Sequence, residues 1–142
     1  MKKYACTLLM TTVLNGCNPK VSELTDELDY CLVSDVTIAW NDVFNQFEAD
    51  YLVYFYSETC GHCREIKNEI IAFYQSRCWA MYFVCTDEYA VFGPRSDLKG
   101  IDNINDFYIF GTPFLCEIKN YVVGDYYVGV NSIREFINNE QK

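Results

Sequence analysis

YLVYFYSETCGHCREIKNEIIAFY, residues 51–74, combines three patterns that together decide the fold. Its first seven residues are rich in aromatic side chains and almost all apolar, which is typical of a buried central strand. Two cysteines, Cys60 and Cys63, follow with two residues between them. Beyond them, apolar residues recur at the spacing of an amphipathic helix, at Ile66, Ile70 and Phe73. The cysteine pair therefore lies where a buried strand gives way to a helix.

Three interpretations of this pair are open: a redox-active dithiol, half of a metal site, or a structural disulfide. A structural zinc ion needs about four ligands. The chain has one histidine, His62, which lies inside the motif, and there is no second CxxC. These counts argue against zinc, so we expect no metal at this site.

Composition excludes several other classes of protein. The chain has 142 residues, is 51% hydrophobic and suits one domain with a proper core. Its formal net charge of −9 leaves no basic stripe for nucleic acid or for anionic lipid. The eight cysteines are too sparse, in so apolar a chain, for a disulfide-stapled miniprotein.

The N-terminus has the pattern of an export signal. Two lysines at positions 2 and 3 precede an apolar run over residues 4–14, too short for a membrane span of about 20 residues. The stretch Leu14-Asn15-Gly16-Cys17 resembles a bacterial lipobox, which implies lipidation of Cys17. We predict a signal peptide over 1–16, a polar tether over 17–35 and a folded domain over 36–142. An ordinary cleaved signal or an uncleaved extension remains an alternative.

The rest of the chain alternates between strand and helix patterns. We predict a short edge strand at 36–39, a helix at 41–49 and a buried strand at 79–85. A short helix is expected within 96–107, then strands at 114–119 and 126–130 and a last helix from Asn131. Early alternation and a late hairpin predict an α/β fold, with a mixed sheet flanked by helices on both faces.

Three local motifs resemble the thioredoxin superfamily, over roughly residues 36–138. The first is the strand that leads into Cys60-Gly61-His62-Cys63. The second, Gly111-Thr112-Pro113 before a strand, is similar to the family's cis-proline loop. The third is Gly129-Val130 leading into the last helix. The resemblance implies a thioredoxin fold in which Thr112 and Pro113 lie against the CxxC and shape a groove for an extended substrate.

Within the superfamily, the CGHC motif resembles protein disulfide isomerases more than ordinary thioredoxins. Two positions depart from the family pattern. Thr59 stands where the family often has Trp. Tyr54 stands where it often buries an acid that helps move protons for the second cysteine. Proton transfer at Cys63 would then depend on water or on another acid such as Glu58.

Physical chemistry assigns roles within the motif. A thiolate at the start of a helix is stabilised by unpaired backbone N–H groups and by the helix dipole. A protonated His62 adds a second favourable charge. Stabilising the reduced thiolate makes the disulfide more oxidising. We therefore predict Cys60 and Cys63 as the catalytic pair and Gly61 and His62 as the residues that tune it.

The other cysteines fall into two groups. Cys85 and Cys116 lie in apolar strands, where a small buried hydrophobic side chain is the simplest interpretation. For Cys31 and Cys78 the sequence leaves open whether they pair.

These observations predict a thiol–disulfide oxidoreductase that acts as an oxidase or isomerase on cysteines of exported proteins. We expect it to be a lipoprotein anchored on the outer face of the bacterial cell membrane. We expect no cofactor, and we expect an unidentified redox partner. An extracytoplasmic reductase is the nearest alternative. A non-catalytic binding module that grips exported peptides in the Pro113 groove is an alternative of another class.

Overall fold

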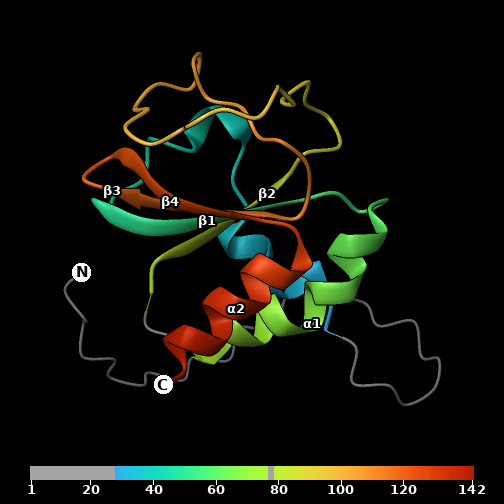
Figure 1. The fold of residues 1–142 in the computed structure, drawn as a ribbon. Coiled ribbons are helices and arrows are strands. Elements are labelled where there is room, and N and C mark those ends of the chain that lie inside the picture. The colour runs from blue at the N-terminus through green and yellow to red at the C-terminus, as the bar shows by residue number, and fades with distance from the viewer. Residues whose placement is uncertain (1–27, 77–78) are drawn as a thin grey trace.

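The computed structural model describes residues 28–76 and 79–142, which form a four-stranded mixed sheet of order β2-β1-β3-β4 (Figure 1). The central strand β1 pairs parallel to β2 and antiparallel to β3, and β3 pairs antiparallel to β4. The strands are β1 (Asp50–Tyr56), β2 (Met81–Cys85), β3 (Phe114–Lys119) and β4 (Val122–Val128). The mixed sheet confirms the predicted α/β class.

Both long helices, α1 (Gly61–Ser76) and α2 (Val130–Glu140), cover one face of the sheet (Figure 1). Their apolar stripes fall at helical spacing and pack on the side chains of alternate strand residues. This core includes Leu52, Tyr54, Phe83, Leu115, Ile66, Ile70, Phe73, Ile133 and Phe136. Residues 51–56 of β1 are all buried, as expected for a central strand with both faces covered.

The opposite face is covered by a short 3-10 helix, η2 (Trp40–Asp42), and by the long connection between β2 and β3. The helices expected at 41–49 and within 96–107 are absent, which corrects those two predictions. Phe47, assigned to the apolar face of the first, is 95% exposed. In the second segment, the backbone N–H groups of Lys99 and Asn105 bond to the Asp97 and Asn103 side chains two residues earlier, forming turns in place of a helix.

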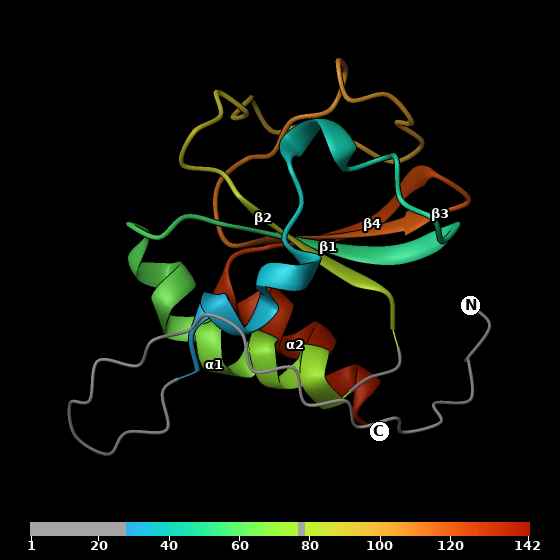
Figure 2. The same ribbon diagram turned by 180° about the vertical axis from the view of Figure 1, so that it is seen from behind.

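The folded part begins before the boundary predicted at residue 36. The 3-10 helix η1 (Tyr30–Val36) lies beside α1 on the same side of the sheet (Figure 2), with Tyr30 and Val33 buried in the core. This helix lies where the sequence predicted the last part of the tether over 17–35. The predicted strand at 36–39 is reduced to one bridge, between Thr37 and Phe83. The predicted signal peptide and Cys17 lie outside the described residues.

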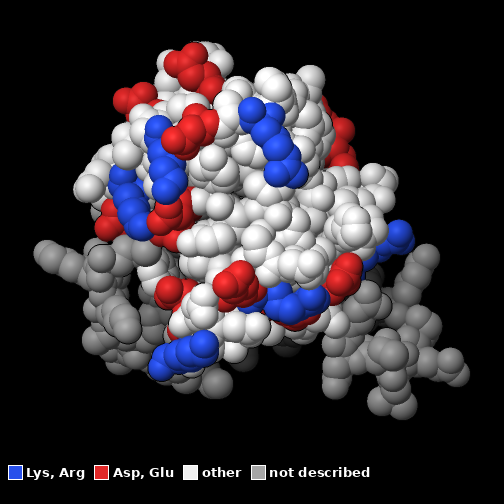
Figure 3. Space-filling model, viewed as in Figure 1, with Lys and Arg blue, Asp and Glu red and all other residues white. Residues whose placement is uncertain are grey.

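Charged side chains of both signs lie on the surface of the described part. On the face seen in Figure 3, Lys and Arg side chains are scattered among acidic and uncharged side chains and form no continuous basic patch. In residues 28–76 and 79–142, no helix is both long enough and apolar enough to cross a bilayer.

Candidate active site

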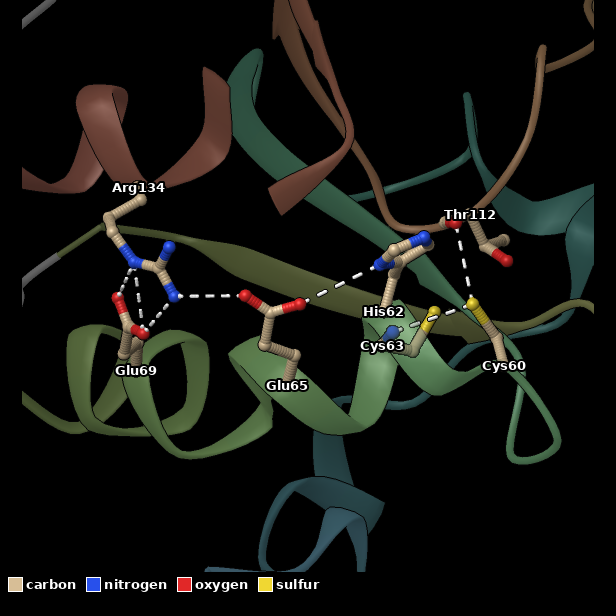
Figure 4. A network of polar contacts seen from close by, with 7 residues as sticks. All are labelled: Cys60, His62, Cys63, Glu65, Glu69, Thr112 and Arg134. Carbon is tan, nitrogen blue, oxygen red and sulfur yellow. Dashed lines mark hydrogen bonds and ion pairs between the residues drawn. The ribbon is translucent and has the colours of Figure 1, made fainter. Parts of the chain in front are cut away.

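Cys60 occupies the cap position immediately before α1. β1 ends at Tyr56, a short turn follows, and α1 begins at Gly61, so the strand and the helix fix the cysteine between them. The Sγ of Cys60 accepts a hydrogen bond from the backbone N–H of Cys63 at 3.4 Å (Figure 4). This N–H is one of those that a helix leaves without an internal partner. The sulfur therefore caps the helix, and the cap favours its negative charge.

The loop before β3 lies against the cysteine pair, as the resemblance implies. The Thr112–Pro113 peptide is cis, and Pro113 is buried. The Sγ of Cys60 lies 3.4 Å from the backbone oxygen of Thr112, although 52 residues separate them. The carbonyl of Pro113 accepts a hydrogen bond of 2.9 Å from Gly129, which ties this loop to the start of α2. The fold thus brings Cys60, Thr112 and Pro113 together.

The two thiols are in different environments, and both are free in the structure, which therefore describes the reduced pair. Burial alone would raise the pKa of Cys60. Hydrogen bonds from the side chains of Thr112 and Cys63 and from the backbone N–H groups of Cys63 and His62 outweigh that effect and lower the pKa of Cys60. Cys63 is fully buried, and burial raises the pKa of its thiol to about 12. The site therefore holds one partly exposed thiol that ionises more readily than a free cysteine and one buried thiol that resists ionisation.

His62 contributes to Cys60 through its backbone, whereas its side chain turns elsewhere. The imidazole is 78% exposed, and its Nδ1 lies 3.6 Å from the Glu65 carboxylate (Figure 4). Gly61 is exposed, and an added Cβ there would meet no atom within 4 Å. That Gly61 and His62 tune the reduction potential of the Cys60–Cys63 pair stays a prediction.

Two tyrosine hydroxyls lie beneath the cysteine pair. Tyr54 is fully buried, and its hydroxyl lies 3.4 Å from that of Tyr30. Tyr30 donates a hydrogen bond of 3.4 Å to the backbone oxygen of Cys63. Burial is the main cause that raises the pKa of both phenols, so both remain neutral at physiological pH. The cysteines thus sit above a neutral polar chain at the position where the family often has a carboxylate.

Tyr30 is a site residue that the sequence analysis missed, because it was assigned to the tether. A signal was available: Tyr30, Val33 and Val36 recur every three residues, which is the repeat of a 3-10 helix.

Asp87, which follows β2, holds the turn that leads to Cys60. Its carboxylate accepts a hydrogen bond of 3.0 Å from the backbone N–H of Glu58. The Ser57 and Thr59 hydroxyls bond to each other at 3.0 Å, and both Glu58 and Thr59 are exposed. This turn is therefore fixed by polar contacts on the surface.

The remaining cysteines differ in state. Cys116 is fully buried and free, which agrees with its interpretation as a small buried hydrophobic side chain. Cys85 is also free but only half-buried, so it fits that interpretation less well. Cys31 is disulfide-bonded. Cys78 lies outside the described residues. Within the described ranges, no group of three or more His, Cys, Asp or Glu side chains is arranged to hold a metal ion.

This arrangement can carry out dithiol–disulfide exchange. An accessible sulfur that ionises readily can attack or be attacked, and a second sulfur three residues on can close the disulfide. The loop with the cis Thr112–Pro113 peptide lies beside this sulfur.

Comparison with known proteins agrees with the geometry. A family model described as Thioredoxin matches residues 32–138. The fold is similar to that of thioredoxin f2 from Chlamydomonas reinhardtii, with a TM-score of 0.50 and 15% identity over 75% of this chain and 95% of that one. Mitochondrial thioredoxin 3 from Saccharomyces cerevisiae is 12% identical, with a TM-score of 0.49 over 78% of this chain and 97% of that one. No protein with curated function matches the chain significantly. The family match and the similarity to thioredoxin f2 confirm the thioredoxin fold expected from the sequence.

Proposed function

We propose, on the premise that the chain belongs to the thioredoxin family of thiol–disulfide oxidoreductases, that it introduces and rearranges disulfides in exported proteins. The observation that carries the proposal is the contrast between the two thiols of the pair. The pKa of Cys60 is lowered by its hydrogen bonds despite burial, whereas burial raises that of Cys63. A stabilised thiolate in the reduced enzyme favours oxidation of the substrate.

In the oxidised enzyme, a substrate thiolate attacks the sulfur of Cys60 and the Cys60–Cys63 bond breaks. Cys63 leaves as a thiolate and takes up a proton, because its buried site favours the neutral thiol. A second substrate thiolate then attacks the substrate sulfur of the mixed disulfide. The substrate disulfide departs, and Cys60 is released as a thiolate that its hydrogen bonds stabilise. Two electrons pass from the substrate dithiol to the enzyme pair.

The same pair can isomerise disulfides. The reduced Cys60 thiolate attacks a substrate disulfide, and the released substrate thiolate is then free to attack another disulfide of the same chain. Thr112 and Pro113 would hold that chain in an extended form beside Cys60, with backbone hydrogen bonds that do not depend on its sequence.

An oxidising compartment fits the chemistry of Cys31. Its disulfide lies outside the CxxC, and such structural disulfides are typical of proteins beyond the cytoplasm. Together with the signal-like N-terminus, this supports export and attachment of the chain by a lipidated Cys17. Mass spectrometry of the protein extracted from membranes tests the anchor: an intact Met1 would overturn it, and a diacylated Cys17 at the N-terminus would support it.

The direction of the reaction is tested by equilibrating the Cys60–Cys63 pair with glutathione. We expect a reduction potential clearly above about −270 mV, where thioredoxin lies, and a value at or below it would favour the reductase alternative. Refolding of scrambled ribonuclease should require Cys60 and be lost in Cys60→Ser. Cys85→Ser, which removes another free thiol, is the matched control and should keep activity. Full function of Cys60→Ser in the cell would favour a non-catalytic binding module.

A further inference from the structure

A line of charged side chains runs from the CxxC to the C-terminal helix (Figure 4). Nδ1 of His62 lies 3.6 Å from one oxygen of Glu65 on the same face of α1. The other oxygen of Glu65 lies 3.7 Å from a terminal nitrogen of Arg134 on α2. Arg134 in turn grips Glu69 with three hydrogen bonds of 2.7 to 3.1 Å. Glu65 therefore stands between two basic groups, one of which belongs to the redox motif.

The position of the imidazole decides what Glu65 does. In Figure 4 the ring turns Nδ1 toward Glu65, on the side away from the sulfur of Cys60. The hydrogen bond from His62 that favours the Cys60 thiolate comes from its backbone N–H and not from the ring. The Glu65 carboxylate partly neutralises a protonated imidazole in this position, which weakens the electrostatic effect of the imidazole on the Cys60 sulfur.

We infer that Glu65 restrains the oxidising strength of the Cys60–Cys63 pair by competing with the Cys60 thiolate for the His62 imidazole. Arg134 limits this competition, because it draws the Glu65 carboxylate toward α2. Glu65 and Arg134 are thus positioning residues that act through His62. This inference rests on the proposed function, since it concerns the potential of the same pair.

The contacts predict that two substitutions change the reduction potential of the Cys60–Cys63 pair in opposite directions. Removing the Glu65 charge releases the imidazole toward Cys60, so the thiolate gains stability and the pair becomes more oxidising. Removing the Arg134 charge leaves Glu65 free to hold His62 more closely, so the pair becomes less oxidising. Partly exposed ion pairs one helix turn apart contribute little, so each change should be about twofold in the equilibrium constant with glutathione, which is about 9 mV.

The test measures the glutathione equilibrium of the full chain for Glu65→Gln and Arg134→Gln. We expect the potential to rise in the first variant and to fall in the second. Glu69→Gln is the matched control, because it removes the same charge from the same helix but from a side chain without a contact to His62. It also frees Arg134 to pair more closely with Glu65, so its potential should rise, but by clearly less than that of Glu65→Gln.

The decisive measurement repeats Glu65→Gln in a His62→Gln background, where the rise should disappear. A rise that persists would mean that Glu65 acts on Cys60 directly, and a fall or no change in the single variant would also overturn the inference. Thiolate absorbance of the single variants gives a second readout of the Cys60 charge. If the wild-type pair exchanged no disulfide at all, the proposed function would fail; a measurable potential that ignores Glu65 would refute this inference alone.

Discussion

The buried tyrosine pair under the cysteines makes a quantitative prediction about stability. Tyr30 gives its one hydroxyl proton to the Cys63 carbonyl at 3.4 Å, so the contact between the two phenols requires Tyr54 to donate to Tyr30. Tyr30→Phe removes both bonds and leaves the Tyr54 hydroxyl, which is fully buried, without its acceptor. An unsatisfied buried donor costs about 1–3 kcal/mol, so we expect Tyr30→Phe to lower the free energy of unfolding by about 1.5 kcal/mol.

Tyr54→Phe removes only the end of this chain, and we expect it to cost about 0.5 kcal/mol. The double variant has no orphaned hydroxyl. It should therefore be more stable than Tyr30→Phe alone, with a loss of about 1 kcal/mol in place of the sum of about 2 kcal/mol. Urea unfolding of the reduced protein measures all three, with an unchanged denaturant slope as the check that only stability has moved.

A third phenol, outside the Tyr30–Tyr54 pair, provides the control for this cycle. Tyr82 donates a hydrogen bond of 2.6 Å to Glu48, away from the pair. Tyr82→Phe should combine additively with Tyr30→Phe within about 0.5 kcal/mol. Additive losses for Tyr30→Phe and Tyr54→Phe, or a double variant less stable than Tyr30→Phe, would refute the directional chain of hydroxyls.

Two further predictions concern pH and packing. The pKa of Cys63 in the folded state is about 12, raised from 9.0, so the reduced protein should keep this contribution to stability below pH 9 and lose it as pH rises toward 12. Alkaline urea unfolding should consequently show a steeper loss for the wild type than for Cys63→Ala, and equal slopes would contradict the assignment. In Gly93→Ala, the new Cβ would collide with the Tyr108 ring, so the melting temperature should fall by several degrees. Gly61→Ala, where an added Cβ meets no atom within 4 Å, should melt close to the wild type.

The sequence specifies the catalytic half of the fold well, because its signals are local. The buried run of β1, the CxxC and the apolar stripe of α1 are contiguous, and each predicts its element without knowledge of the rest. The strand at 114–119 was predicted with the bounds it has. Contact of Thr112 and Pro113 with Cys60 spans 52 residues, and it could be expected only through the resemblance to a family.

The second face could not be predicted in the same way. Apolar residues at helical spacing, Val43, Phe44 and Phe47, predicted a helix whose apolar face would pack on the sheet. In the structure Val43 is buried but Phe47 is exposed, so only part of that predicted face packs against the core. Polar side chains that bond to nearby backbone compete with helices, and the segment before β3 has several of them. The link from Glu65 to Arg134 joins residues on two different helices, and no local pattern marks it.

The two edge strands of the sheet, β2 and β4, are partly covered by loops of the same chain. Outside β2, the backbone N–H of Ile38 bonds to the Phe83 carbonyl at 2.8 Å. Outside β4, Val123 exchanges two bonds of 2.8 Å with Gly100 and Ile101. Both outer rows of backbone groups are thus partly occupied by the chain's own loops, which blocks the addition of a foreign strand at those points. Another protein that presents an exposed strand would therefore find less of either sheet edge open to it.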